Sequence, residues 1–252
     1  MIVVLSSVRG SPGVTSWSLL LAAAWPAEYE AERVVLEADP AGGVLGVRYG
    51  LGVEPGVVTL IAGLRRSAGE PVPVAEHGRP IGPGTWVIPG PETGEQSFAL
   101  WSRLASTVAA GVAGDERVWV VDAGRIDAAS PQRAFVEHAS LTLVVSRPAH
   151  EDLLQVPARV ATMQRTCPTV GVIVVGKTRH KAAELAQFFG TGLVWTVPAA
   201  RDDMTEFVGA AVTGGRARRS WVWRRAVEVA ADVATKVTHE PTPARTRLVV
   251  AE

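Results

Sequence analysis

The beginning of the chain decides the fold: an apolar run, Ile2 to Leu5, is followed over residues 6–16 by SSVRGSPGVTS and then by a helical pattern. The order strand, glycine-containing loop, helix is typical of a phosphate-binding loop. In such a loop successive backbone N–H groups point inward, and the N-terminus of the following helix adds partial positive charge. Gly10 and Gly13 provide the backbone freedom that this geometry needs. An ordinary strand–turn–helix corner is the alternative, and this stretch alone does not exclude it.

One position departs from the usual phosphate loop, because Val14 stands where a lysine normally follows the last glycine. Such a lysine bridges phosphate oxygens and stabilises the charge that develops during phosphoryl transfer. Losing one preorganised charge costs ~3–4 kcal/mol of transition-state stabilisation, or about 10²–10³ in rate. Thr15 can still place its hydroxyl on a Mg²⁺ ion. The sequence therefore predicts weakened nucleotide binding and slow or absent hydrolysis.

Composition sets broad limits on the function. The 252 residues include 25 basic and 25 acidic side chains, so no overall charge favours nucleic acid or membrane. A single cysteine excludes an internal disulfide and fits a reducing compartment. The chain enters a strand at once, without the layout of a signal peptide, and its apolar runs are shorter than a bilayer requires. We therefore expect a cytoplasmic protein.

Short apolar segments alternate with helical patterns along the chain. The expected strands are continuous apolar runs, as in strands covered on both faces: Ile2–Leu5, Arg33–Leu36, Thr85–Ile88, Arg117–Val121, Leu141–Val145, Val170–Val175 and Leu193–Val197. The expected helices are Ser16–Trp25, Gln96–Val112, His150–Met163, Lys181–Phe189 and Arg216–Val237. This alternation predicts an α/β fold of three layers, a mostly parallel twisted sheet with helices on both faces.

No linker divides the pattern, so we expect one domain over residues 1–237. Residues 238–252 are expected to form a flexible C-terminal tail, since Pro241 and Pro243 break any helix there. Residues 70–83 are rich in proline and glycine and are expected to form a surface excursion.

Acidic residues follow two of the predicted strands. The strand at Arg33–Leu36 leads into Glu37 and Asp39, and the strand at Arg117–Val121 leads into Asp122. The carboxyl ends of parallel strands meet at one edge of the sheet, where the glycine loop also lies. A phosphate loop and carboxylates at one edge are what Mg²⁺-nucleotide chemistry needs.

With these segments the chain resembles the ParA/MinD family of ATPases, whose deviant Walker A loop reads Lys-Gly-Gly-x-Gly-Lys-Thr-Thr. The resemblance covers about residues 1–235 and implies the P-loop NTPase fold. The eight corresponding positions, which the resemblance makes nucleotide-binding, are Arg9, Gly10, Ser11, Pro12, Gly13, Val14, Thr15 and Ser16.

The resemblance also implies roles for individual side chains. The signature lysine of the family, which reaches the partner subunit's nucleotide, falls on Arg9. Asp39 falls on the residue that positions the attacking water, so Asp39 and Arg9 are the catalytic candidates. Thr15, Asp39 and Asp122 are the candidates for holding Mg²⁺. Pro198, in a Val-Pro pair, corresponds to a position near the adenine.

Arg9 has two interpretations from its own chemistry. A guanidinium is always charged and binds phosphate in a bidentate manner, so Arg9 can contact phosphates of its own or a partner subunit. Alternatively, it is a solvated loop residue.

The resemblance departs from the family at the contact to the base. The asparagine with which the family reads the base falls on Gly176, so that contact is in doubt.

The function that the resemblance implies is that of a positioning or partitioning protein. It would bind ATP and Mg²⁺, hydrolyse ATP weakly or not at all, and act as a homodimeric switch or scaffold with a protein partner. Two alternatives stay open. One is a pseudo-ATPase scaffold without nucleotide in pilus or secretion assembly, as in CpaE/TadZ-like relatives with damaged loops. The other is a DNA-segregation ATPase that binds DNA non-specifically.

The last predicted helix is rich in arginine and tryptophan. The residues concerned are Arg216, Arg218, Arg219, Trp221, Trp223, Arg224 and Arg225. Such a stretch can contact a DNA backbone or an anionic membrane. In the other interpretation, which we favour, the tryptophans pack on the sheet while the arginines face water. The following tail is not amphipathic, which argues against stable membrane anchoring.

Overall fold

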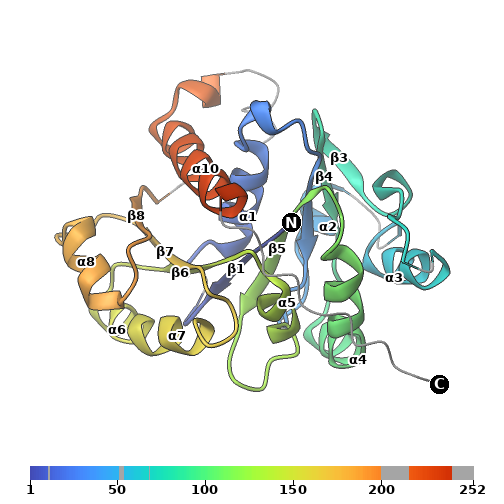
Figure 1. Ribbon diagram of the computed structural model, residues 1–252, viewed down its shortest axis with the longest axis horizontal. Coiled ribbons are helices and arrows are strands. Elements are labelled where there is room, and N and C mark those ends of the chain that lie inside the picture. The colour runs from blue at the N-terminus through green and yellow to red at the C-terminus, as the bar shows by residue number, and fades with distance from the viewer. Residues whose placement is uncertain (11, 51–53, 68, 200–215, 240–252) are drawn as a thin grey trace.

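The computed structural model describes residues 1–10, 12–50, 54–67, 69–199 and 216–239, and within them one eight-stranded sheet forms the centre (Figure 1). The strand order is β3-β4-β2-β5-β1-β6-β7-β8, and only the β3–β4 pair is antiparallel. The strands are β1 (Ile2–Ser7), β2 (Arg33–Glu37), β3 (Arg79–Gly82), β4 (Thr85–Ile88), β5 (Val118–Arg125), β6 (Leu141–Ser146), β7 (Val170–Val175) and β8 (Val194–Val197). This arrangement confirms the predicted α/β fold class.

The central strands are fully buried, which explains their continuous apolar sequences. All six residues of β1 and of β6 are buried, because helices cover both faces of the sheet. The seven predicted strands are all present. β3 was not predicted, because its sequence Arg-Pro-Ile-Gly lacks strand periodicity and it pairs only at the sheet edge with β4.

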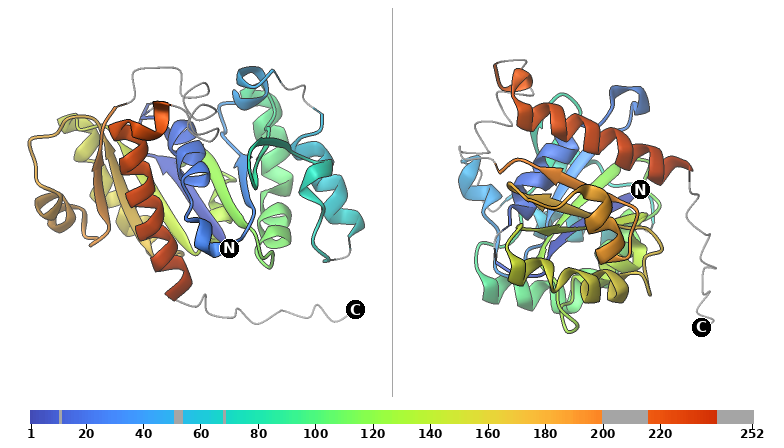
Figure 2. Two further views of the ribbon diagram at one scale, coloured as in Figure 1. Left: turned by 90° about the horizontal axis from the view of Figure 1, so that it is seen from above. Right: turned by 90° about the vertical axis from the view of Figure 1, so that its left-hand side faces the viewer.

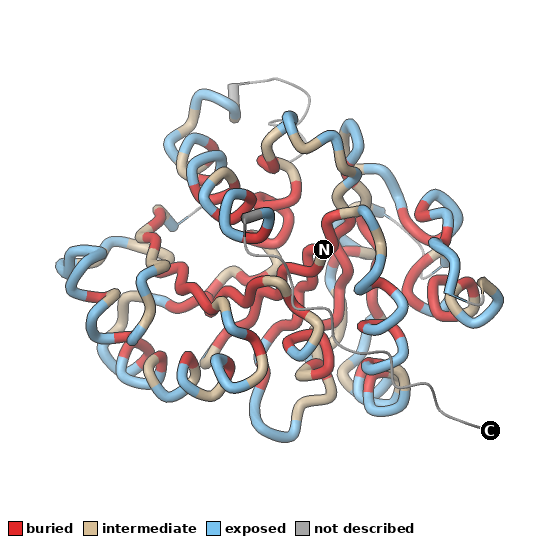
Figure 3. Tube along the Cα trace, in the orientation of Figure 1, coloured by how far each residue is buried: buried red, intermediate tan, exposed pale blue. Residues whose placement is uncertain are grey.

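Helices lie on both faces of the sheet, as predicted (Figures 1 and 2). α1 and α10 cover one face, whereas α3, α4, α5, α7 and α8 cover the other, and each face has its own apolar core. The helices are α1 (Val14–Ala23), α2 (Leu45–Arg48), α3 (Val57–Arg66), α4 (Gly94–Val112), α5 (Arg133–His138), α6 (His150–Leu153), α7 (Val156–Met163), α8 (Ala182–Phe189) and α10 (Trp221–His239). Figure 3 shows that burial concentrates in the strands and in the helix faces turned toward them.

Several predicted helices have different bounds. The helix expected over residues 150–163 is divided into α6 and α7, because Pro157 lacks an N–H and is tolerated only in the first turn of a new helix. The helix expected from Arg216 begins as a 3₁₀ turn, Arg216–Arg219, and α10 continues to His239. α2, α3 and α5 were not predicted.

The expectation of a surface excursion over residues 70–83 was wrong in part. This segment includes a 3₁₀ turn, Val74–Glu76, and strand β3. Val72, Val74 and His77 are buried, with Val72 and Val74 in the core on the α3 side of the sheet. Alternate small apolar residues between the prolines anchor the segment, which proline and glycine content alone did not reveal.

The structure describes only part of the region where the predicted domain meets the predicted tail. α10 passes the predicted boundary at residue 237, and residues 240–252 of the predicted tail lie outside the described residues. Among the helices that the structure describes, none has the length and apolar character needed to cross a bilayer.

Candidate functional site

The loop between β1 and α1 has the backbone of an anion cradle. Gly10 has a φ of 53° and Gly13 a φ of 97°, which are left-handed values that glycine adopts without strain. Gly13 caps α1, and among the described residues no side-chain hydrogen bond caps the start of that helix. These donors and the positive end of the helix dipole therefore face the space in front of the loop.

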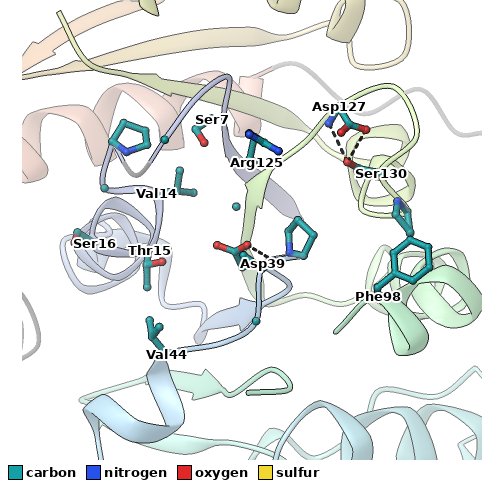
Figure 4. Close-up of a pocket in the computed structure, with 18 of the residues that line it drawn as sticks. Ser7, Val14, Thr15, Ser16, Asp39, Val44, Phe98, Arg125, Asp127 and Ser130 are labelled. Atoms are coloured by element: carbon teal, nitrogen blue, oxygen red, sulfur yellow. Dashed lines mark hydrogen bonds between the residues drawn. The ribbon is translucent and has the colours of Figure 1, made fainter. Parts of the chain in front are cut away.

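A pocket of about 950 Å³ opens in front of this loop (Figure 4). Three segments supply most of its lining: the loop itself, residues 39–44 after β2, and residues 124–131 at and after the end of β5. Of the predicted nucleotide contacts, the lining includes Gly10, Pro12, Gly13, Val14, Thr15 and Ser16. Ser11 lies outside the described residues.

Val14 takes the first position of α1 and is itself 6% exposed. It lines the pocket, yet it also belongs to the apolar core shared by Trp17 and Leu5. Figure 4 shows its side chain on the same wall as Thr15 and Ser16. An uncharged side chain is thus packed where a phosphate loop normally extends a cation.

Asp122, near the end of β5, is buried beside this pocket. Its Oδ1 accepts a hydrogen bond from the Gly124 N–H at 3.2 Å, and its Oδ2 has no partner in the described part of the chain. Burial raises the pKa of Asp122 to about 7, with the charges of Asp39 and Glu37 adding to the rise and the Thr15 hydroxyl opposing it. A buried carboxylate with an unpartnered oxygen is unfavourable unless a cation or a proton compensates it.

Asp39 stands on the pocket wall opposite the loop (Figure 4). Its Oδ1 accepts a hydrogen bond from the Ala41 N–H at 2.8 Å, and burial raises its pKa. Gly124 permits this approach, because a Cβ on Gly124 would lie 2.3 Å from the Asp39 Cγ. Asp39, Thr15 and Asp122 are therefore brought to one region from β2, α1 and β5.

Glu37 has a structural role next to this site. Its Oε1 accepts hydrogen bonds from the N–H groups of Val44 (2.6 Å) and Leu45 (3.0 Å), and its Oε2 accepts one from Gly90 (3.0 Å). Burial raises its pKa, and these three bonds oppose the rise. Glu37 thus ties the segment after β2, which lines the pocket, to the end of β4.

No group of three or more His, Cys, Asp or Glu side chains with metal-binding geometry occurs among the described residues. A Mg²⁺ ion typically keeps several waters and is held by one or two protein oxygens together with phosphates of its ligand. Thr15 lines the pocket, whereas Asp122 is fully buried behind the lining and interacts with the Thr15 hydroxyl. A carboxylate with an unpartnered Oδ2 behind a pocket hydroxyl fits that sparse type of site.

Two predicted residues are placed elsewhere. Arg9 is about half exposed and forms a long ion pair with Asp152 (Nε–Oδ1 3.8 Å), and Arg147 pairs with the same carboxylate (Nε–Oδ2 2.8 Å). Neither Arg9 nor Pro198 belongs to the lining of this pocket as the structure describes it. Pro198 follows β8, which is separated from β2 by four strands in the sheet order.

The structure adds pocket residues that the sequence did not single out. Arg48 in α2, Phe98 in α4 and Arg125 at the end of β5 line the pocket, and Phe98 is 61% exposed. Arg125 follows Asp122 by three residues. Its place at the carboxyl end of a predicted central strand was the sequence feature that could have identified it as a pocket residue.

The basic stretch before and within α10 is divided between core and surface. Trp223 is buried, as expected, whereas Trp221 is 63% exposed and does not pack on the sheet. Arg219 and Arg224 are exposed, and Arg225 forms an ion pair with Glu228 and donates to the Thr196 carbonyl.

Comparisons with known proteins are consistent with this architecture. No family model matches the chain, and no curated protein sequence matches it significantly. Among solved structures, the cell division ATPase MinD of Pyrococcus furiosus has a TM-score of 0.74 at 14% identity, covering 93% of this chain and 98% of that one. MinD of Pyrococcus horikoshii complexed with Mg-ADP has a TM-score of 0.68 at 15% identity, covering 92% and 96%.

A ParA family ATPase from Chlorobium tepidum gives the same TM-score of 0.68 at 17% identity, covering 91% of this chain and 97% of that one. At such low identity the similarity establishes a common fold, and it extends over nearly the whole length of each protein. The chain therefore has the three-layer α/β fold of the MinD and ParA ATPases.

Proposed function

We propose that the pocket binds a nucleotide with Mg²⁺ and that the chain is a ParA/MinD-like positioning or partitioning protein with weak or absent ATP hydrolysis. The observation that carries this proposal is the buried Asp122, whose Oδ2 has no partner among the described residues, beside the Thr15 hydroxyl and the α1 N-terminus. A bound Mg²⁺ would compensate the carboxylate and join it to phosphate oxygens.

Each of these residues would then have a defined role in binding the nucleotide and the ion. The N–H groups around Gly13 and at the start of α1 would bind phosphate oxygens, and Thr15 and Asp122 would hold the ion. Asp39, across the pocket, would accept a hydrogen bond from an attacking water. Val14 would lower the rate of phosphoryl transfer, because no lysine at this position stabilises the charge that develops on the phosphates.

Thermal unfolding with ATP·Mg²⁺, ADP·Mg²⁺ and GTP·Mg²⁺ tests nucleotide binding. A ligand at 100 times its dissociation constant stabilises by about 2.7 kcal/mol, which for a chain of this size raises Tm by roughly 5–10 °C. Asp122→Asn is the informative variant, because it should lose the part of the shift that depends on Mg²⁺. No shift of the unmodified protein with any nucleotide would reject the proposal.

Hydrolysis is tested separately by phosphate release. We expect little release from the unmodified protein, and Val14→Lys should increase it by one order of magnitude or more if the missing cation is the limiting feature. Brisk turnover of the unmodified protein would contradict this part of the proposal. Size-exclusion chromatography with and without nucleotide tests the homodimer, which remains a proposal.

A second candidate function is a pseudo-ATPase scaffold that binds protein partners without nucleotide, for example in pilus or secretion assembly. The packing of Val14 into the core shared with Trp17 favours it, since that position is committed to folding. Absence of any nucleotide-dependent shift, together with a lower free energy of unfolding in Val14→Ala, would support the scaffold.

DNA binding is a third candidate, supported by the exposed Trp221, Arg219 and Arg224. Salt-sensitive binding to duplex DNA that is lost in Arg219→Gln/Arg224→Gln would support it.

A further inference from the structure

Arg125 combines three features that no role assigned so far explains. It lines the pocket in front of the glycine loop, it is exposed, and its side chain forms no hydrogen bond or ion pair with any residue that the structure describes. Arg9 and Arg147, in contrast, both pair with the carboxylate of Asp152. An unpaired guanidinium in a concave wall is available to an anionic ligand.

The backbone holds Arg125 firmly at this place. β1 and β5 pair in parallel, with Leu5 opposite Asp122 and Ser7 opposite Arg125. Two steps along β1 therefore correspond to three along β5, and the extra residue forms a bulge at Gly124, whose φ is 55°. Bulges redirect the next side chain, and here that side chain is Arg125, placed beside the first residues of the loop.

No ion pair joins the Arg125 guanidinium to a carboxylate among the described residues. Asp127 is close in sequence, but its Oδ1 accepts hydrogen bonds from the Ala129 N–H (2.9 Å) and the Ser130 hydroxyl (3.1 Å). The negative charge of Asp127 raises the pKa of Arg159 on α7, and the positive charge of Arg125 lowers it. Figure 4 shows Arg125 between Ser7 and the Asp127–Ser130 turn, on the side of the pocket facing Val14.

We propose that Arg125 binds the phosphate groups of a polyphosphate ligand and supplies the positive charge that the loop lacks at Val14. The cation comes from the end of β5 instead of from the first turn of α1. A guanidinium suits this position, since its planar fork can bind two phosphate oxygens at once and its charge does not depend on pH. Arg125 is thus a ligand-binding residue. The proposal rests on the proposed function only in requiring a ligand that bears phosphates.

Titration calorimetry with two probes, sodium tripolyphosphate and ATP, each with Mg²⁺, tests the proposal. We expect Arg125→Gln to weaken tripolyphosphate binding by about 10- to 100-fold, the range for one charge-assisted bond. Arg125→Lys should retain part of the affinity. Val14→Lys in the Arg125→Gln background should restore it, an effect that a purely structural role for Arg125 would not produce.

Arg103→Gln is the matched control. Arg103 is an exposed arginine on α4 outside the pocket lining, so its removal should change affinity less than twofold. Thermal unfolding of all variants without ligand verifies that they fold.

The outcomes separate this inference from the proposed function. Wild-type binding of both probes with no loss in Arg125→Gln overturns the role of Arg125 and leaves nucleotide binding intact. Binding of tripolyphosphate but not ATP, with loss in Arg125→Gln, supports Arg125 and rejects the nucleotide. Failure of the unmodified protein to bind either probe rejects both.

Discussion

Replacing the buried carboxylate of Asp122 with an amide should stabilise the protein in the absence of metal and nucleotide. Asp122 is fully buried, and its Oδ2 finds no partner among the described residues. Asn has nearly the same shape and carries no charge at any pH. The variant Asp122→Asn therefore removes the cost of a buried negative charge while retaining an oxygen that can accept from the Gly124 N–H.

The size of the effect follows from the pKa of Asp122. Burial raises this pKa from 3.8 to about 7, and about three pH units correspond to roughly 4 kcal/mol. Because the folded pKa is raised, the folded state keeps its proton at pH values where the unfolded chain has lost it. The free energy of unfolding contributed by this group therefore falls as the pH rises from about 4 to about 7, and it is constant above.

The amide recovers only part of this energy. Its NH₂ group takes the place of Oδ2, which has no partner among the described residues, and an unsatisfied buried donor costs roughly 1–3 kcal/mol. The net gain for Asp122→Asn at pH 8 is then about 1–3 kcal/mol, which raises Tm by roughly 2–12 °C in a protein of this size. At pH 4 to 5 the wild-type carboxyl is protonated, so the advantage disappears.

Thermal and urea unfolding at pH 4.5, 6, 7 and 8, in EDTA, measure this difference. Asp127→Asn is the matched control, because hydrogen bonds from the Ala129 N–H and Ser130 lower the pKa of that exposed carboxyl. It should give no gain at pH 8. Equal stability of Asp122→Asn and wild type at pH 8, or a gain that does not change with pH, would refute the reasoning.

The remaining predictions concern three buried positions. Gly124→Ala should lower the free energy of unfolding by roughly 1–3 kcal/mol, because its φ is 55° and the new Cβ would lie 2.3 Å from the Asp39 Cγ. Gly114→Ala, with open space at the Cβ, is the control in the same urea titration, and equal losses would contradict the contact. Glu37→Ala should cost roughly 2–5 kcal/mol by leaving three N–H groups without an acceptor, and it should increase amide exchange over residues 43–45; unchanged exchange would argue against the tether. His77 is 3% exposed and neither ring nitrogen has a partner in the described structure, so burial lowers its pKa, reinforced by Arg66 and opposed by Glu76. Its contribution to stability is present above about pH 6.5 and is lost as the pH falls below it, so His77→Leu should make unfolding less sensitive to acid between pH 7.5 and 5.5; an unchanged pH dependence would exclude this role.

The sequence determined the fold class and the core of the site. Continuous apolar strands, such as Val118–Val121, are required wherever both faces of a strand are covered, so their periodicity is readable from residues alone. The glycine loop and the acidic ends of β2 and β5 were also readable, because the carboxyl ends of parallel strands meet at one edge. On this basis Thr15, Asp39 and Asp122 were predicted to lie together, and the structure brings them to one region.

Only the tertiary structure decided which arginines line the pocket, and these are Arg48 and Arg125. From the sequence, Arg9 was the natural substitute for the missing lysine, since it lies in the loop. In the folded chain Arg9 faces Asp152, while Arg125 is directed to the pocket by a bulge at Gly124. The direction of a side chain after a bulge depends on strand register between distant segments, and no local pattern encodes it. The pKa of Asp122 likewise arises from burial by residues far away in the sequence, because a carboxylate loses its solvation only when the whole sheet closes around it.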